Sequence, residues 1–191
     1  MSSFMVRKIK YSAGDIVSKA FELVRESGWS GLSTKAVAKE IGCSTMPIYS
    51  QFKNLKDLEH AVMEKSWDLL MQYEAREHTG DVWIDQAIGY VFFARDEHQL
   101  FRSMYDGRHP EKQRELLSIN WEYLCRNLHD YSPFKGVEEE KLSQIRFSRV
   151  MMTHGLASMV NIGWSPQIQE DKIIIEKITS GSRALLKGLD L

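Results

Sequence analysis

The sequence predicts an all-α protein of about nine helices, in which a small N-terminal three-helix domain (residues 1–57) precedes a larger helical domain (residues 58–191). Apolar residues recur at three- and four-residue spacing along most of the chain, which is the period of an amphipathic helix. Only four prolines interrupt this pattern, and no segment alternates convincingly in the manner of a strand. With 191 residues, 43% of them hydrophobic, the chain has enough apolar side chains for a buried core.

The first helix is predicted from Ala13 to Glu26, because apolar residues recur there with helical spacing and Gly28 follows as a stop. A short second helix follows the potential N-cap Ser33 and ends at Gly42. The start of this second helix is therefore marked by a capping side chain and its end by a glycine.

A third short helix is expected from Thr45 to Phe52, with Ser44 as its cap. Pro47 falls in the first turn, where a missing N–H costs little. Ile48 and Phe52 share one side of this helix and are expected to pack inward.

Six further helices are predicted, each with a capping or breaking residue at one end or both. The second of the six is apolar nearly all round, so it should lie at the centre of the larger domain. Glu138, Glu139 and Glu140 suit the start of a helix, where negative charge is favoured. The predicted ranges are 55–77, 82–93, 99–105, 110–131, 137–162 and 168–189.

Positive charge is concentrated at the N-terminal end of the chain. Residues 1–57 hold nine Lys and Arg against five Asp and Glu, a net charge of +4, whereas the whole chain has −1 and the remainder therefore −5. This asymmetry indicates that the basic end faces a polyanion. The nine cations are Arg7, Lys8, Lys10, Lys19, Arg25, Lys35, Lys39, Lys53 and Lys56.

Several classes of protein are disfavoured by the sequence. No apolar run is long enough for a membrane span and the first residues lack the features of a signal peptide, so a cytoplasmic protein without a membrane partner is expected. Cys43 and Cys125 are isolated, which gives neither a disulfide framework nor a Cys-x-x-Cys motif. The phosphate-binding, nucleophile-elbow, zinc-protease and dinucleotide motifs are all missing, so we expect no enzyme, no catalytic residue, no metal and no cofactor. A catalytic site assembled from scattered residues stays open.

Residues 32–54 carry the functional prediction. Two short helices joined at Gly42, with Ile41 just before the turn and Ile48 after it, have the pattern of a helix-turn-helix. In that motif the first helix braces across the DNA backbone and the second presents its N-terminal side chains to the major groove.

This stretch closely resembles the DNA-binding segment of TetR-family transcriptional regulators, a resemblance that covers about the first third of the chain. Cys43 stands where the family usually has Val, and Leu55 replaces a common Lys, for which Lys56 could compensate. The resemblance implies a homodimeric regulator of double-stranded DNA. Family habit alone favours a repressor over an activator. The matching residues are Leu32, Ser33, Val37, Ala38, Ile41, Gly42, Ser44, Ile48, Tyr49, Phe52, Lys53 and Asn54.

The same resemblance implies roles for individual residues. Tyr49 and Lys53 would contact phosphates, with Thr34 and Lys35 close to the DNA backbone. Glutamine can bond adenine bidentately, and Thr or Met can pack on a thymine methyl, so base readout needs no arginine. The residues expected to face base edges are Thr45, Met46, Ser50 and Gln51.

Alternatives remain at this stage. Tyr49 could be a core aromatic, Lys35 and Lys39 could be ordinary solvated surface, and Cys43 could be a redox sensor instead of an inert thiol. A helical module that binds DNA without sequence preference is a further reading, and sequence-specific binding at physiological salt would exclude it.

The larger domain is expected to dimerise and to hold a ligand. By resemblance, its last two helices form the dimer interface, although their apolar stripes could instead serve only the protomer's own core. The interface residues expected are Met152, Leu156, Met159, Ile174, Ile178 and Leu185.

A small apolar or aromatic ligand is the remaining expected partner. Large aromatic residues on the middle helices could line its pocket, and each could equally be ordinary core. His154 is expected to be a satisfied core or interface histidine, not a metal ligand. The pocket residues expected are Trp67, Trp83, Tyr90, Phe93, Tyr105 and Trp121.

Overall fold

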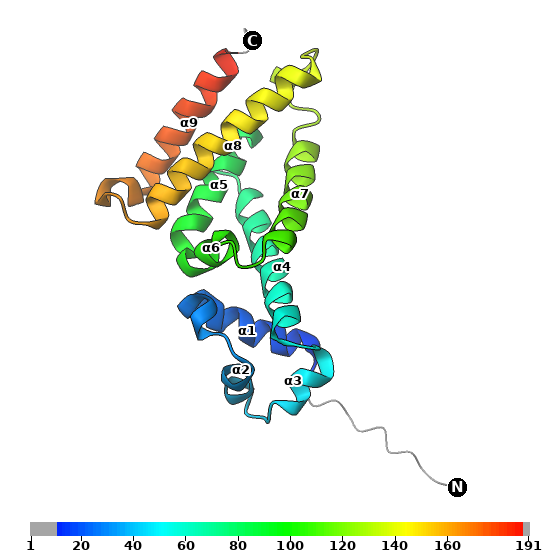
Figure 1. Ribbon diagram of the computed structural model, residues 1–191. Helices are drawn as coiled ribbons and strands as arrows, with labels where there is room; N and C mark the ends of the chain where they lie inside the picture. The colour runs from blue at the N-terminus through cyan, green and yellow to red at the C-terminus, as the bar shows by residue number, and fades with distance from the viewer. Residues whose placement is uncertain (1–10, 189–191) are drawn as a thin grey trace. The chain divides into compact units, whose positions relative to one another are not determined.

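The computed structural model describes residues 11–188, and within this range the chain is all-α, with nine α-helices and no strand. The predicted fold class is confirmed, and the helix ends differ from the predicted ones by a few residues. The chain divides into two compact units between Lys65 and Ser66. In Figure 1 the helices are α1 Ala13–Ser27, α2 Thr34–Ile41, α3 Met46–Gln51, α4 Leu55–Glu74, α5 Val82–Asp96, α6 His98–Tyr105, α7 Pro110–Asn127, α8 Glu139–Asn161 and α9 Asp171–Lys187.

In the first unit, α1 is the element on which α2 and α3 pack. Ser12 and Asp15 form a reciprocal capping box at its start, in which the Ser12 hydroxyl accepts from the Asp15 N–H and the Asp15 carboxylate accepts from the Ser12 N–H. One face of the helix is buried, as its periodicity predicts. The residues of that face are Ile16, Ala20, Phe21 and Val24.

The helix α4 belongs to both units. Its first turn is capped by Asn54, whose side-chain oxygen accepts from the Asp57 N–H at 2.9 Å. Leu58 and Val62 are buried in the first unit, and the helix ends at Glu74, inside the second. The boundary expected from the sequence, between residues 57 and 58, lies near the start of this helix.

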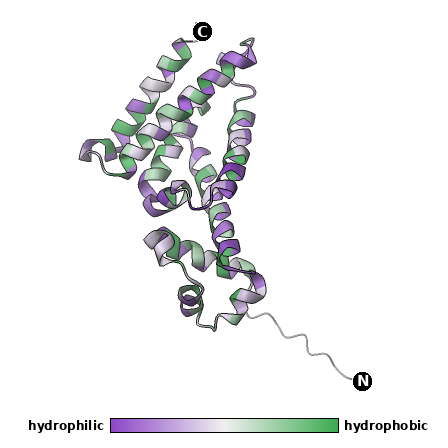
Figure 2. Ribbon diagram, in the orientation of Figure 1, coloured by the Kyte–Doolittle hydropathy of each residue, from purple (hydrophilic) through white to green (hydrophobic). Residues whose placement is uncertain are grey.

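The second unit is built around α5, which contacts α6, α8 and α9. Asp81 caps it by accepting from the Trp83 N–H at 3.0 Å. Eleven of its fifteen residues are buried, so the prediction of a central helix is confirmed. The helices α8 and α9 instead carry hydrophobic and hydrophilic residues in turn along their length (Figure 2), which suits elements with one face on α5 and one face outward.

The helix α9 corrects part of the predicted dimer interface. Ile174 and Ile178 are fully buried within the protomer, on a helix that packs against α5. The Trp83 indole N–H donates to the Ser182 carbonyl at 3.4 Å across the same contact. These two isoleucines therefore cannot meet a second chain, because the protomer's own core already covers them.

Buried polar contacts tie α8 to the same core. The Asn161 amide donates to the carbonyl oxygens of Ala94 and His98, at 2.7 and 3.1 Å, and its oxygen accepts from Arg102 at 3.1 Å. One side chain thus joins the end of α8 to α5 and α6. None of the helices within residues 11–188 combines the length and apolarity that a membrane span requires.

A single glycine sets the distance between α4 and α5. A Cβ built on Gly89 would clash with the backbone carbonyl of Tyr73 and lie 2.8 Å from the Glu74 Cα. Backbone cannot move aside as a flexible side chain can, so only glycine permits this approach.

Gly89→Ala should therefore destabilise the second unit. We expect a loss of about 2–4 kcal/mol in the free energy of unfolding, because the added methyl group forces α4 and α5 apart. Chemical unfolding followed by circular dichroism measures it. Gly14→Ala is the control, since its Cβ would meet only the Ser12 hydroxyl at 3.7 Å in the first turn of α1. Equal stabilities of the two variants would show that the helices are not in fixed contact.

Candidate functional sites

The first candidate site is the segment α2–turn–α3, whose turn is determined by local backbone chemistry. Ser33 caps α2 by accepting from the Ala36 N–H at 3.0 Å. Gly42 has a φ of +73°, in the left-handed region, and the Cys43 N–H donates back to the Ala38 carbonyl at 2.9 Å. Both predicted ends of α2 are confirmed.

The helix α3 is shorter than the sequence suggested. It covers Met46–Gln51, with Pro47 in its first turn as predicted. Ser44 does not cap it, because Thr45 precedes the helix and no side chain bonds its first N–H groups. Ile48 is buried, as predicted, whereas Phe52 is only half-buried.

The outward face of α3 presents large side chains to solvent. Met46 is 73% exposed and Tyr49 is 53% exposed, so Tyr49 is not a core aromatic. The Tyr49 hydroxyl lies 3.4 Å from the Thr34 hydroxyl, which brings the starts of α2 and α3 together at one surface. Ser50 donates to the Pro47 carbonyl at 2.7 Å, which leaves its oxygen free to accept.

Cations surround this surface. Lys35, Lys53, Lys56 and Gln51 are exposed and Thr34 and Thr45 are half-buried, so all nine predicted DNA-contacting residues retain solvent-accessible surface. Lys39 is exposed as well. Arg7, Lys8 and Lys10 lie outside the described residues. A short helix with apolar, amide and hydroxyl groups outward, flanked by lysines, has the chemistry to read base edges and hold phosphates.

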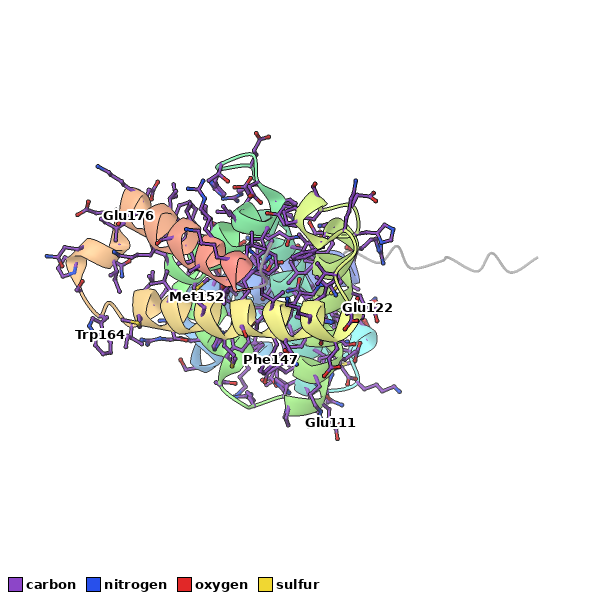
Figure 3. The ribbon with its side chains drawn as sticks, turned by 90° about the horizontal axis from the view of Figure 1, so that it is seen from above. Glu111, Glu122, Phe147, Met152, Trp164 and Glu176 are labelled. Atoms are coloured by element: carbon purple, nitrogen blue, oxygen red, sulfur yellow. The ribbon has the colours of Figure 1, made fainter. Side chains whose placement is uncertain are left out.

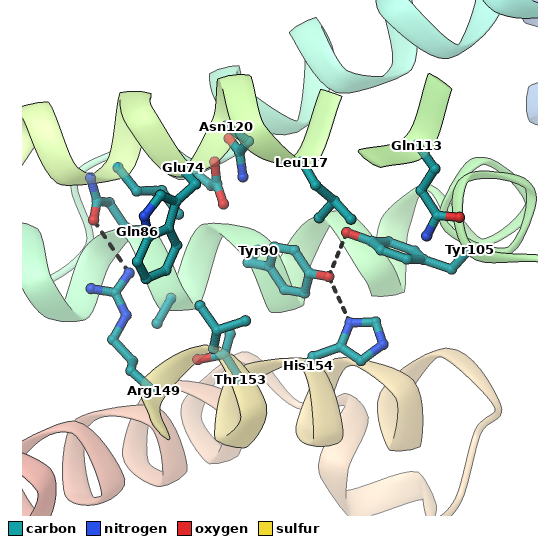
Figure 4. Close-up of a pocket in the computed structure, with 14 residues that line it drawn as sticks. Glu74, Gln86, Tyr90, Tyr105, Gln113, Leu117, Asn120, Arg149, Thr153 and His154 are labelled. Carbon is teal, nitrogen blue, oxygen red and sulfur yellow. Dashed lines mark hydrogen bonds between the residues drawn. The ribbon is translucent and has the colours of Figure 1, made fainter. Parts of the chain in front are cut away.

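The second candidate site is a cavity of about 300 Å³ in the second unit, between α4, α5, α6, α7 and α8 (Figure 4). Of the six aromatic residues predicted to line a pocket, Tyr90, Tyr105 and Trp121 line this cavity. The other three, Trp67, Trp83 and Phe93, are core side chains with at most 2% exposure and do not line it. Helical periodicity identifies buried aromatic residues but does not tell a packed interior from a cavity wall.

One end of the cavity holds a cluster of hydrogen-bonded rings. The Tyr90 hydroxyl donates to the Tyr105 hydroxyl at 2.8 Å and lies 2.8 Å from the His154 Nδ1 (Figure 4). Burial raises the pKa of both tyrosines and lowers the pKa of His154, so all three rings are held neutral. His154 is thus a half-buried histidine with a hydrogen-bond partner, and it forms part of the cavity wall.

The other end carries a buried charge. Arg149 is 5% exposed, its guanidinium donates to the Gln86 side-chain oxygen at 3.3 Å, and it lies 4.2 Å from the centre of the Trp83 ring. Burial lowers the pKa of Arg149 to about 10, which leaves it protonated at neutral pH. Among the described residues, no other arginine or lysine lines the cavity.

Glu74, at the end of α4, is the second ionisable group of interest. Burial raises its pKa to about 8, and the hydrogen bond from Asn120 and the charge of Arg149 only partly oppose that rise. The carboxyl group is therefore mostly protonated at neutral pH.

The polar residues of this wall were not predicted from the sequence. Their helices are predicted from apolar periodicity, and a polar residue on a buried helix face was the available signal. They are Glu74, Gln86, Gln113, Asn120, Arg149 and Thr153. Within residues 11–188 no group of three or more His, Cys, Asp or Glu is placed to hold a metal ion, and both cysteines are free.

Comparison with known proteins identifies the fold. No family model and no curated protein matches the sequence. A transcriptional regulator from Rhodococcus sp. Rha1 superposes with a TM-score of 0.67 at 15% identity, over 95% of this chain and 99% of that one. The TetR-family regulator PfmR from Thermus thermophilus gives 0.54 at 13% identity, over 90% of this chain and 97% of that one.

A protein of unknown function from Rhodococcus sp. RHA1 is also similar, with a TM-score of 0.69 at 20% identity over 94% of this chain and 96% of that one. The chain therefore has the all-α fold of TetR-family transcriptional regulators, as the resemblance of residues 32–54 predicted. At identities this low the likeness is one of fold.

Replacing Glu74 with glutamine tests the charge state of the cavity. The carboxyl ionises near pH 4.5 in the unfolded chain and near pH 8 in the folded one, so the folded state binds more protons between these values. Stability should fall as pH rises through this window, by up to about 1.4 kcal/mol per unit. Glu74→Gln cannot ionise, so its free energy of unfolding relative to wild type should increase from pH 5 to pH 8 in urea titrations.

The control is Glu122→Gln, at an exposed position of α7. Its difference from wild type should not change between the two pH values. A pH-independent difference for Glu74→Gln as well would mean that Glu74 ionises normally in the folded protein.

Proposed function

We propose that this chain is a sequence-specific DNA-binding transcriptional regulator that acts in the cytoplasm as a homodimer, and that it is a repressor released from its operator by a small-molecule ligand. The observation that carries the proposal is the surface of α3. Met46, Tyr49 and Gln51 are exposed on a helix that Ile48 anchors in the core, and lysines flank it. An all-α fold shared with TetR-family regulators supports it further.

Binding would divide between two kinds of contact. The side chains of α3 would enter the major groove, where Gln51 can recognise adenine and Met46 can pack on a thymine methyl. Tyr49, Lys53 and Lys35 would hold phosphates and set the register. Because the chain carries a net charge of −1, its DNA affinity should depend on these local cations and weaken as salt rises.

The dimer would form through α8. The residues of one outward stripe of this helix follow one another at three- and four-residue spacing, which is the spacing found where two helices pack along a seam. Phe147 and Met151 in this stripe are 59% and 55% exposed, which is unusual for large apolar side chains. Figure 3 shows Phe147 and Met152 on opposite sides of α8. The stripe consists of Phe147, Met151, Gly155 and the half-buried Ser158 of α8, followed by its C-cap residue Ile162.

Four of the six interface residues expected from the sequence retain surface that a partner could reach. Met152, Leu156, Met159 and Leu185 are half-buried. Met152 also packs within the protomer, since its side chain is the nearest to Gly181 of α9. Because Met152 lies on the other side of α8 from Phe147, these four stay predictions and are not part of the stripe.

The ligand response would pass through α4. This helix begins four residues after α3 ends, and its last residue, Glu74, lines the cavity. The ligand and the DNA would prefer different arrangements of α4. Ligand binding would then lower the affinity for DNA by the same factor by which DNA lowers the affinity for the ligand.

Selection of binding sites from a random DNA pool at physiological salt tests the function. Enrichment of a palindrome, bound by one or two dimers, supports the regulator. Binding that is lost at physiological salt without enrichment would instead indicate a module without sequence preference.

Variants of α3 should separate the two kinds of contact. Tyr49→Phe and Lys53→Ala should weaken binding to all sequences by similar factors, and Lys53→Ala should reduce the salt slope by about 1. Gln51→Ala should change the preferred base at one position, at about 1–3 kcal/mol. Fluorescence anisotropy on the selected site and its point variants measures both. Unchanged binding in all three variants would contradict the assignment of α3.

Met151→Glu should produce a monomer. A carboxylate in the middle of the seam leaves a charge buried without a partner, which costs several kcal/mol at an interface. Sedimentation velocity compares it with wild type. Ile119→Glu, at a similarly exposed apolar position of α7, is the matched control and should stay dimeric. A monomer from both variants, or from neither, would exclude the α8 seam.

A further inference from the structure

The cavity wall contains more polar groups than the protein itself satisfies. Five of the side chains that line it each have a buried polar atom without a hydrogen-bond partner among the described residues. All five residues are at most 6% exposed, so bulk water does not compensate them. The atoms are Glu74 Oε2, Gln86 Nε2, Asn120 Oδ1, Arg149 Nη1 and Thr153 Oγ1.

Charge at this site is unbalanced. Arg149 is protonated, whereas Glu74, with a pKa of about 8, is mostly neutral at pH 7. His154 is neutral as well, because burial lowers its pKa. The wall therefore carries one net positive charge on a buried side chain, and an anion is favoured over a cation beside it.

The remaining wall is apolar and includes the flat ring of Trp121. Its apolar residues are Ala87, Leu117, Trp121, Leu124 and Val150. A volume of about 300 Å³ is at the lower limit of ligand pockets, which restricts the occupant to a small molecule. In Figure 4 the Arg149–Gln86 pair and the Tyr90–Tyr105–His154 cluster stand apart, with Leu117 above the space between the tyrosines and Asn120 beside Glu74.

We propose that this cavity binds a small organic carboxylate with a planar apolar body, whose carboxylate accepts from Arg149 Nη1 and whose body lies between Trp121 and Val150. Gln86 Nε2 supplies a further donor at the same end, and the Thr153 hydroxyl supplies one from the next turn of α8, between Arg149 and His154. The regulatory meaning of this binding rests on the proposed function, but the binding itself does not.

A direct test compares ligands that share a body and differ in charge. The two series are indole-3-acetate, indole-3-acetamide and tryptamine, and cinnamate, cinnamamide and cinnamylamine. Calorimetry on the DNA-free protein at pH 7 should give, in at least one series, a carboxylate that binds about 10-fold or more tighter than its amide and its amine, as expected for a charge-assisted hydrogen bond. Amine or amide binding at least as tight as the carboxylate, or no binding by either carboxylate up to about 1 mM, the weak end of specific affinities, overturns the proposal.

Two variants of α8 locate the carboxylate. Arg149→Gln should weaken carboxylate binding by about 10- to 100-fold, as expected for a lost charge-assisted hydrogen bond, and should leave amide binding unchanged. Arg146→Gln, one turn earlier and outside the cavity wall, should have no effect. Equal affinities of wild type and a folded Arg149→Gln overturn the assignment. If Arg149→Gln does not fold, Thr153→Val takes its place, with an expected loss of about 3- to 10-fold.

The two proposals fail separately. A selected operator without carboxylate binding overturns the ligand class and leaves the regulator intact. Carboxylate binding without any enriched DNA site overturns the regulator and leaves the ligand class intact.

Discussion

The contact of Gly89 with the backbone of Tyr73 and Glu74 is the constraint on which the second unit depends. It holds α5 against the end of α4 at a distance that only a residue without a Cβ permits. Because α6, α8 and α9 pack on α5, the same contact also relates these three helices to the end of α4. The same contact fixes Glu74 in the cavity wall, where α5 itself supplies Gln86, Ala87 and Tyr90.

The buried polar groups of the cavity wall lower the stability of the free protein. Each buried polar atom without a hydrogen-bond partner lowers the free energy of unfolding by roughly 1–3 kcal/mol, so the five atoms of this wall destabilise the free protein. Arg149 is kept in place by Gln86 and by the Trp83 ring, which offset part of the cost of burying its charge. A core selected for stability alone would hold apolar side chains at these positions, whereas a binding site needs the unsatisfied groups.

On α3, in contrast to the cavity wall, the polar groups are exposed to solvent. Its polar and aromatic groups are exposed, and Ile48 anchors the helix below them. Local chemistry determines this segment almost completely: Ser33 starts α2, Gly42 reverses the chain, and Pro47 opens α3. This is why the helix-turn-helix could be identified from the sequence, and why the exposure of Tyr49 agrees with the role that the resemblance implied.

The sequence alone predicts the all-α fold, the nine helices within the described residues, the caps at Ser33 and Asp81, and the central position of α5, because periodicity and capping act over a few neighbouring residues. Which apolar residues line a cavity, lie in the core or stay exposed depends instead on the tertiary structure. Trp67, Trp83 and Phe93 lie in helices with the same apolar periodicity as those of Tyr90, Tyr105 and Trp121, yet only the last three line the cavity. Ile174 and Met151 both belong to apolar stripes, yet one is buried and the other exposed. The difference arises from packing between helices far apart in the chain, as at Gly89. The spacing of apolar residues within one helix does not predict such packing.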